Sequence, residues 1–132
     1  MRTSLLIGKE RRDGINLQSA WLQRANLRFS SLERANLKYA NLFDANLESA
    51  WLNRVCLRDA VLIGANISSA SLDDVNFVSS FFRRAKFQGA KFSEADFNRA
   101  DFRGAKNLDK AIWPKGWKLV KEEDDDGTFH CK

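Results

Sequence analysis

Side chains able to do acid–base, nucleophilic or metal chemistry are few in this sequence, and their spacing does not bring them together. The single histidine, His130, precedes Cys131, and the other cysteine is Cys56. One histidine and one cysteine are too few ligands for a structural zinc site, which takes four, and a segment without periodicity does not hold a nucleophile and a base in register. The adjacent acids Asp73 and Asp74 take outward positions with no pocket expected beside them. We therefore predict no catalytic, cofactor-binding or metal-binding residues, no cofactor, and a protein that is not an enzyme.

A five-residue repeat from Ile15 to Gly104 must position every other feature of the chain. Each fifth residue from Leu17 is large and apolar, eighteen times without insertion or deletion, and from Phe77 onward it is always phenylalanine. Two places before each of these central residues stands a small residue: thirteen are alanine, and the exceptions are Ile15, Ser30, Val55, Val75 and Ser80.

The period of five fits neither an α-helix nor a flat strand. Residues five apart drift around an α-helix, and an odd spacing would send successive leucines to opposite faces of a strand. A chain that turns a corner after each unit closes a square coil of twenty residues, and the next coil stacks on it at the ~4.8 Å spacing of paired strands. We expect the small and the large residue of each unit to point inward, as in a solenoid.

Four columns of central residues follow from a twenty-residue coil, and we call them faces A to D. Face A holds Leu17, Leu37, Leu57, Phe77 and Phe97, and face B holds Leu22, Leu42, Leu62, Phe82 and Phe102. Face C holds Leu27, Leu47, Ile67 and Phe87, and face D holds Leu32, Leu52, Leu72 and Phe92. The rings from Phe77 onward are predicted to form offset stacks.

The units resemble those of a known family. Ala-Asn-Leu-Arg-Phe at 25–29, Ala-Asn-Leu-Lys-Tyr at 35–39, Ala-Asn-Leu-Glu-Ser at 45–49 and Ala-Asp-Phe-Asn-Arg at 95–99 resemble the A(D/N)LXX unit of pentapeptide-repeat proteins, over 90 of 132 residues. The closing Ile-Trp-Pro-Lys-Gly-Trp at 112–117 resembles the tails of small cyanobacterial members. This resemblance implies an all-β, right-handed quadrilateral β-helix of about 4.5 coils with short helical caps.

The pattern divides the chain into four segments. We predict an N-terminal cap over 1–14, the β-helix over 15–104, a C-terminal cap over 105–120 with a helical turn from Leu108 to Ile112, and an acidic, flexible tail over 121–132. The tail contains five consecutive acids at 122–126. Caps are expected because the end coils of a solenoid otherwise expose apolar side chains and a strand edge.

Two further positions of the unit are predicted to be structural. Gly14, Gly64, Gly89 and Gly104 fall on the third residue of the four-residue corner, where a type II turn needs a positive φ; the turn type where other residues stand there is left open. The slot before the central residue is often asparagine, and a column such as Asn26, Asn46 and Asn66 could share side-chain hydrogen bonds from coil to coil.

An apolar strip on face B is the candidate interface. Outward slots there bring together Trp21, Phe43, Val61, Ile63 and Phe81, with Tyr39 at the adjacent corner. A strip of this kind indicates either an interaction surface or bulky groups that only shelter the ladder.

Basic residues outnumber acids by five over the chain, and without the five tail acids the counts are 22 and 12, a balance of +10. The basic residues are spread over several faces and mixed with acids. This distribution is typical of a solvated surface, whereas a nucleic-acid-binding site gathers its basic residues in one stripe. The basic residues concerned are Arg24, Arg34, Arg54, Arg58, Arg83, Arg84, Lys86, Lys91, Arg99 and Arg103.

Three functions are compared. The favoured one is a non-catalytic scaffold that presents side chains to another protein or to its own copy; the alternative is nucleic-acid binding through the basic solenoid surface. The family resemblance adds a third, DNA mimicry directed at DNA gyrase, which calls for an acidic solenoid, whereas residues 15–104 are net basic. Apolar runs too short to span a bilayer and an N-terminus without a signal-peptide core predict a cytoplasmic protein without a membrane or small-molecule partner.

Overall fold

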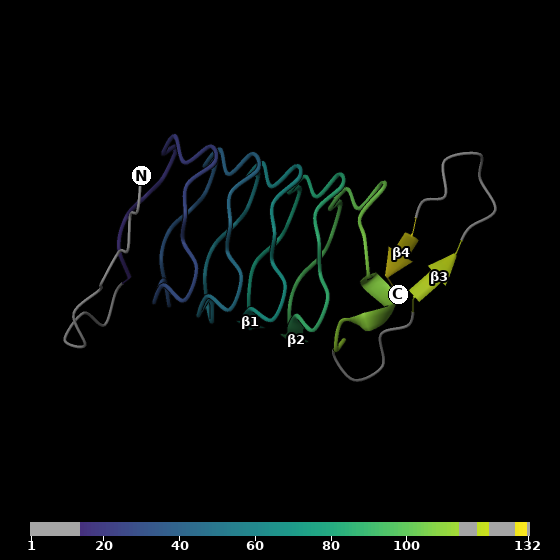
Figure 1. Cartoon of the computed structure of the whole chain (residues 1–132). Coiled ribbons are helices and arrows are strands. Elements are labelled where there is room, and N and C mark those ends of the chain that lie inside the picture. The colour runs from purple at the N-terminus through teal and green to yellow at the C-terminus, as the bar shows by residue number, and fades with distance from the viewer. Residues whose placement is uncertain (1–13, 114–118, 122–128, 132) are drawn as a thin grey trace.

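The structure is a computed structural model that describes residues 14–113, 119–121 and 129–131 of the chain. Figure 1 shows a stack of coils along one axis, whose colour runs from purple in the first described coil to green in the last. Residues twenty apart pair in parallel from Asn16↔Asn36 to Lys86↔Lys106. Since the repeat is five residues long, each coil has four sides, and the chain forms the expected all-β solenoid.

Regular elements are short because each side of the coil has room for only a few residues before the next corner. On face D, β1 (Ser71–Asp73) pairs in parallel with β2 (Lys91–Ser93). A single 3-10 turn, η1 (Leu108–Lys110), follows the repeat, and β3 (Leu119–Lys121) pairs antiparallel with β4 (Phe129–Cys131). No helix among the residues that the structure describes is long and apolar enough to cross a membrane.

The interior is a single apolar column made of the two inward residues of each unit. From Leu27 to Phe92 every central residue is at most 2% exposed, whereas Leu17 and Leu22 in the first coil are only partly buried. Ser30 and Ser80, which replace alanine, each donate a hydroxyl hydrogen bond of 2.6 Å to the carbonyl three residues earlier. Burial of a leucine side chain stabilises by roughly 1.5–3 kcal/mol, so the stack rests on many similar contributions.

Phenylalanine rings fill the C-terminal coils in the stacks that the sequence predicted. Phe77 lies over Phe97 with ring centroids 5.0 Å apart and planes 5° apart, and Phe82 lies over Phe102 at 5.0 Å and 9°. Rings on neighbouring faces meet edge to face, as Phe77 and Phe82 do at 66°. Both arrangements suit the aromatic quadrupole, and they confirm the predicted ring stacks.

The repeat ends through the insertion of one residue. Lys106 still pairs with Lys86, but Ile112 pairs with Lys91, a separation of 21 residues. Asn107 adopts φ 60°, and Leu108 enters the core one residue late, at 2% exposure. The helical turn predicted from Leu108 to Ile112 is thus shorter, a 3-10 turn ending at Lys110.

Trp113 extends the aromatic stack beyond the last full coil. Its indole lies 4.8 Å from the Phe92 ring with planes 12° apart, and its Nε1 donates a hydrogen bond of 2.8 Å to the Leu108 carbonyl. The predicted N-terminal cap falls on residues 1–13, and much of the predicted C-terminal cap and tail falls on 114–118 and 122–128, all outside the described residues. Strand β3 lies at the end of the predicted C-terminal cap and includes the first residue of the predicted tail, and β4 lies within the segment predicted to be a flexible tail.

The corners use one conformation whatever residue occupies them. The third residue of every turn from Ser19 to Gly104 has φ between 50° and 70°. In most of these turns the next residue donates to the central carbonyl, as Ser30 N does to Leu27 O at 3.2 Å; no such bond is recorded for the corners that follow β1 and β2. Arg, Asp, Ser, Glu and aromatic residues therefore adopt the left-handed region along with glycine, which costs a non-glycine residue roughly 1–2 kcal/mol.

Gly14 is the exception to this rule, and the positive φ predicted for it is wrong. Its backbone lies outside the left-handed region, and a Cβ there would collide with the backbone of Arg34 and Ala35 in the next coil. The absence of a side chain at Gly14 thus permits a close approach between coils rather than a turn.

The asparagine slot works differently from the predicted ladder. In each unit the residue that follows the central one has a backbone N–H that points away from the neighbouring coils. The Asn or Asp that precedes the central residue accepts a hydrogen bond from this N–H: Glu48 N donates to Asn46 Oδ1 at 3.1 Å. All seven Asn and both Asp residues at this slot make this bond, and none of them bonds to the asparagine above or below. The side chains therefore cap the backbone within their own unit.

Replacing Leu47 by aspartate should collapse the stack. Leu47 is fully buried, and a carboxylate there would lose its hydration without gaining a partner, at a cost of at least about 3 kcal/mol in the free energy of unfolding. The matched control is Glu48→Ala, which removes an exposed ion pair with Arg28 at 3.4 Å and should cost under about 1 kcal/mol. Urea unfolding followed by circular dichroism measures both. An unchanged midpoint for Leu47→Asp would show that position 47 does not face the core.

Removing one backbone cap should have a smaller, specific effect. Asn41 Oδ1 accepts the N–H of Phe43 at 3.1 Å, so Asn41→Ala should lower the free energy of unfolding by about 1 kcal/mol. Asn41→Asp retains the acceptor, and Asp101 in the same column makes the equivalent bond; this variant should stay close to the wild type in the same urea titration. Equal losses for both variants would contradict the capping role.

Candidate interaction site

The register of the solenoid decides which members of the predicted face-B strip are neighbours. Trp21, Asn41, Val61, Phe81 and Asp101 pair successively in one column. Trp21 is therefore separated from Val61 by the polar Asn41, whereas Val61 and Phe81 are direct neighbours.

A second column of the strip lies two residues further along each unit. The carbonyls of Phe43, Ile63 and Arg83 accept hydrogen bonds of 2.8–2.9 Å from the preceding coil, which places these residues one coil apart in order. Phe43 and Ile63 thus lie beside Asn41 and Val61. The structure brings together four of the six predicted residues: Phe43, Val61, Ile63 and Phe81.

Burial within this group distinguishes it from isolated exposed residues. Phe43, Val61 and Ile63 are half-buried, and Phe81 is 43% exposed. By contrast, Trp21 is 85% exposed, and Tyr39, at the corner before face B, lies under the Lys38 ammonium at 5.0 Å from its ring centroid. Trp21 and Tyr39 are therefore peripheral to a compact apolar group that we call the face-B patch (Phe43, Val61, Ile63 and Phe81).

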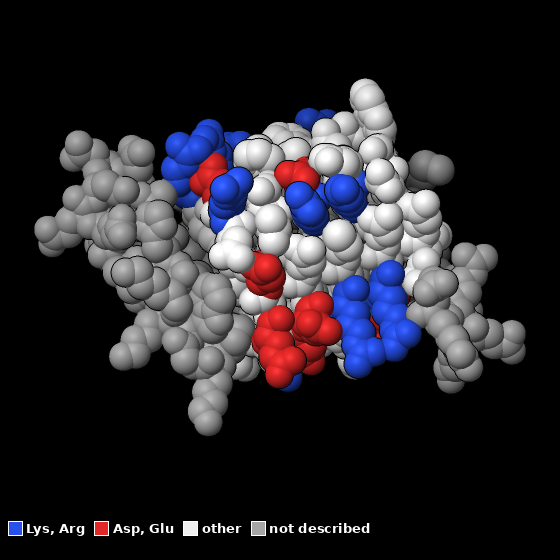
Figure 2. All heavy atoms as spheres, turned by 180° about the vertical axis from the view of Figure 1, so that it is seen from behind, with Lys and Arg blue, Asp and Glu red and all other residues white. Residues whose placement is uncertain are grey.

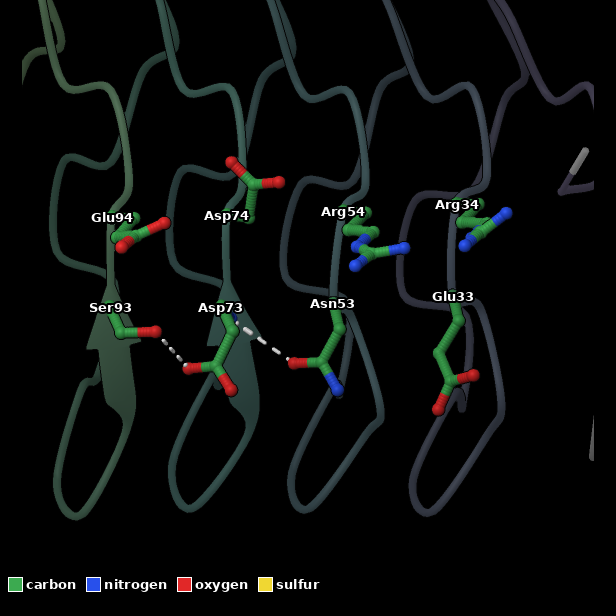
Figure 3. Close-up of a pocket in the computed structure, with 8 residues that line it drawn as sticks. All are labelled: Glu33, Arg34, Asn53, Arg54, Asp73, Asp74, Ser93 and Glu94. Carbon is green, nitrogen blue, oxygen red and sulfur yellow. Dashed lines mark hydrogen bonds between the residues drawn. The ribbon is translucent and has the colours of Figure 1, made fainter.

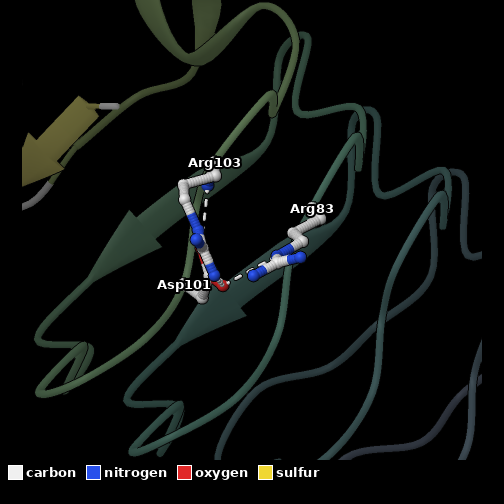
Figure 4. A network of polar contacts seen from close by, with 3 residues as sticks. All are labelled: Arg83, Asp101 and Arg103. Atoms are coloured by element: carbon white, nitrogen blue, oxygen red, sulfur yellow. Dashed lines mark hydrogen bonds and ion pairs between the residues drawn. The ribbon is translucent and has the colours of Figure 1, made fainter. Parts of the chain in front are cut away.

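A charged network borders the face-B patch on the side of the C-terminal coils (Figure 4). Arg83 Nε donates to Asp101 Oδ2 at 3.0 Å, and Arg103 donates to both carboxylate oxygens of Asp101, with Nη2 at 2.7 Å from Oδ2. Asp101 follows Phe81 in its column, and Arg83 follows Ile63. An apolar centre bounded by polar side chains is the ordinary anatomy of a protein interface.

The patch costs the solenoid part of its own stabilisation. Val61 and Phe81 stand at the slot where Asn or Asp caps the backbone, and neither side chain can accept the N–H of Ile63 or Arg83. In the same column Asn41 and Asp101 make that bond. The repeat therefore tolerates a cap at this column, so the apolar residues there are not a requirement of the fold.

A shallow polar groove of about 460 Å³ lies on face D, where the sequence predicted no pocket beside Asp73 and Asp74. That prediction is wrong, because the outward residues of four successive coils line up there (Figure 3). Ser93 Oγ donates to Asp73 Oδ1 at 2.8 Å, and Asp73 N donates to Asn53 Oδ1 at 3.1 Å. The groove's outer column holds Arg34, Arg54, Asp74 and Glu94. Every twentieth residue from Arg34 would have revealed this column in the sequence.

The basic residues do not form one stripe. Arg83 and Arg103 share Asp101, and Arg58 contacts Asp59 at 3.4 Å. Figure 2 shows basic side chains scattered among acidic and uncharged ones on the visible face. Among the described residues, no three His, Cys, Asp or Glu side chains are grouped closely enough to hold a metal ion, and Cys56 is a free, half-buried thiol.

Comparison with known proteins agrees with this architecture. A family model for pentapeptide repeats, with eight copies, matches residues 13–48, 40–77 and 79–112. A pentapeptide repeat protein from the Arabidopsis thaliana thylakoid lumen is 30% identical, with 74% of this chain and 68% of that chain covered and a TM-score of 0.71. One from the cyanobacterium Cyanothece is 26% identical, with 67% and 63% covered and a TM-score of 0.40.

A more distant likeness extends to the fold alone. QnrB1, a plasmid-mediated fluoroquinolone resistance protein, is 16% identical, with 82% of this chain and 74% of that chain covered and a TM-score of 0.50. No match was found among curated proteins. The family model spans the whole described solenoid and the repeat is uninterrupted within it, and the chain belongs to the pentapeptide repeat family.

Proposed function

We propose that this chain is a non-catalytic scaffold that binds another protein through the face-B patch. The observation that carries the proposal is the column Asn41, Val61, Phe81, Asp101. Its middle two residues give up a backbone cap and place apolar surface in water, although flanking residues show that the cap fits there. A partner that covers Val61 and Phe81 would recover the cost of that exposure.

The size and composition of the patch suit the centre of an interface. Phe43, Val61 and Ile63 are half-buried and Phe81 is 43% exposed, and the four residues lie on neighbouring coils of one stack. Rigid presentation lowers the entropy lost on binding, and aromatic anchors surrounded by a charged rim are typical of the residues that dominate binding energy.

Nucleic-acid binding is the second candidate, supported by the net charge of +5. It would depend on phosphate contacts and therefore weaken steeply with salt, whereas binding through an apolar patch would not. A gyrase-directed DNA mimic has less support, because residues 15–104 are net basic and a mimic of DNA must be acidic. The cytoplasmic location and the absence of enzymatic activity stay predictions.

Two pairs of substitutions test the face-B patch. Phe43→Lys with Ile63→Lys places charges at its centre, whereas Val61→Asn with Phe81→Asn restores the cap of neighbouring coils. We expect neither double variant to recover the partner in a pull-down from a nuclease-treated lysate of the source organism. Rebinding of the purified partner to the wild type and to the variants is then measured at moderate and at high salt. The second pair should also raise the free energy of unfolding by about 1 kcal/mol, since each new amide oxygen accepts a backbone N–H.

The asparagine pair is the sharper control because it separates binding from folding. A variant that is at least as stable as the wild type and yet loses the partner places the interface on face B. Recovery of the same proteins by the wild type and by both variants would contradict the proposal, and recovery of only nuclease-sensitive material would favour the basic surface.

A further inference from the structure

Two backbone N–H groups in the face-B patch have no acceptor within the chain. The N–H groups of Ile63 and Arg83 donate to no residue that the structure describes, because Val61 and Phe81 stand where an Asn or Asp would accept them. These two groups lie one coil apart, at the ~4.8 Å spacing of stacked strands. The patch therefore combines apolar side chains with two neighbouring donors that a partner can satisfy.

The Arg83 side chain adds further donors at the C-terminal edge of the patch. A guanidinium has five N–H bonds, and only that of Nε is engaged here, with Asp101 Oδ2 at 3.0 Å (Figure 4). Over the described residues, the two Nη nitrogens donate to no acceptor, and the side chain is 48% exposed. Four N–H bonds of one charged group are thus available beside an apolar surface.

The acceptors of this surface, by contrast, are already engaged. Asn41 Oδ1 accepts the N–H of Phe43 at 3.1 Å, and the Asp101 carboxylate accepts from both the backbone and the side chain of Arg103. Four backbone carbonyls of the surface accept hydrogen bonds from the preceding coil: those of Val61, Ile63, Phe81 and Arg83. A partner that completes the hydrogen bonds of the patch must therefore supply acceptors.

Charge on the C-terminal side of the patch favours acceptors that are anionic. The four face-B units that carry the patch and its rim contain three arginines and two acids, a balance of +1. These are Arg83, Arg84, Arg103, Asp44 and Asp101. Asp44 lies two coils before Arg83, and two arginines share Asp101, so the C-terminal side is basic and complementary to an anion.

Asp101 shows how this face holds a carboxylate. It stands one coil after Phe81 in the same column, and its oxygens accept from Arg103 N at 3.1 Å and from Arg83 Nε at 3.0 Å. A carboxylate brought by a partner to the level of Phe81 would meet equivalent donors, the N–H of Arg83 and the Nη groups of the same residue. Such charge-assisted hydrogen bonds are roughly twice as strong as neutral ones.

We propose that the partner of the face-B patch is an acidic, apolar protein segment, in which a carboxylate lies next to a large aliphatic or aromatic side chain. This inference rests on the proposed function and names the chemistry of the partner at that site. The apolar side chain covers Val61 and Phe81, and the carboxylate accepts from the backbone and the guanidinium of Arg83. A phosphate backbone supplies acceptors but no apolar group for Val61 and Ile63, so a protein segment fits better than a nucleic acid.

A random peptide library displayed on phage is the probe, because it requires no knowledge of the natural partner. The library is panned at moderate salt against the immobilised wild type and, in parallel, against Val61→Asn with Phe81→Asn. The wild type should enrich peptides in which Asp or Glu lies beside a large apolar residue. The asparagine pair should not, because its own amide oxygens accept both N–H groups and its apolar surface is reduced.

One enriched peptide, made synthetically, then identifies the groups that hold it. Replacing its acid by alanine should weaken binding at least about tenfold, and replacing its apolar residue by alanine should weaken binding as much. In ¹H–¹⁵N spectra the amide signals of Ile63 and Arg83 should move downfield with the acidic peptide. The peptide without the acid should leave them in place.

Two substitutions in the chain separate the donors from the apolar surface. Phe81→Leu leaves the N–H of Arg83 open and should bind the peptide nearly as the wild type does, whereas Phe81→Asn caps that N–H and should lose binding. Arg83→Gln removes the cation and should lower the ratio of affinities for the acidic and alanine peptides about two- to fivefold, as expected for an exposed charge pair.

The possible failures of this inference and of the proposed function differ. Neutral or basic peptides that bind the wild type and not the asparagine pair would overturn the acidic partner but leave face B as the binding surface. Peptides that bind both proteins equally, or no enrichment on the wild type, would count against the proposed function as well. Undiminished binding without the apolar residue, or tighter binding of an oligouridylate than of any enriched peptide, would also overturn the inference.

Discussion

Backbone hydrogen bonds between successive coils are the constraint on which this protein depends. Leu27 N donates to Asn46 O at 2.7 Å, and Asn46 N donates to Ala25 O at 2.9 Å, so each unit is bonded to both neighbouring coils. Because these bonds need a constant coil length, one extra residue displaces every inward side chain that follows. The structure shows this at the end of the repeat, where the separation changes from 20 to 21 residues and the regular coils stop.

The same register turns a linear sequence into columns with separate chemistry. Inward positions are nearly uniform, because an alternation of small and large side chains is what fills a square coil of this width. Outward positions are free to differ, and their neighbours are the residues one coil away rather than those beside them in the chain. Capping by Asn or Asp recurs in half of the units, where it satisfies the one N–H that points away from the stack.

Face B departs from that chemistry at Val61 and Phe81, which give up caps for apolar contact, and it is the surface for which we propose a protein partner. Face D, whose outward residues line the polar groove, lies on the opposite side of the four-sided coil, two units apart in sequence. A partner bound to the face-B patch would therefore leave the face-D groove exposed.

The sequence by itself determined the family, the twenty-residue coil and the inward residues, because an unbroken local period leaves one way to bury its apolar positions. It also indicated the phenylalanine stacks and the apolar residues of face B. Only the tertiary structure showed that non-glycine corners share one left-handed conformation, that Asn46 caps its own unit, and that Trp21 lies apart from Val61. The groove on face D was also found only in the structure, although its outer column can be read in the sequence at every twentieth residue from Arg34. These features depend on the direction of each side chain and on contacts between coils. The type of a residue does not specify them, because its neighbours in space are known only once the register of the coils is known.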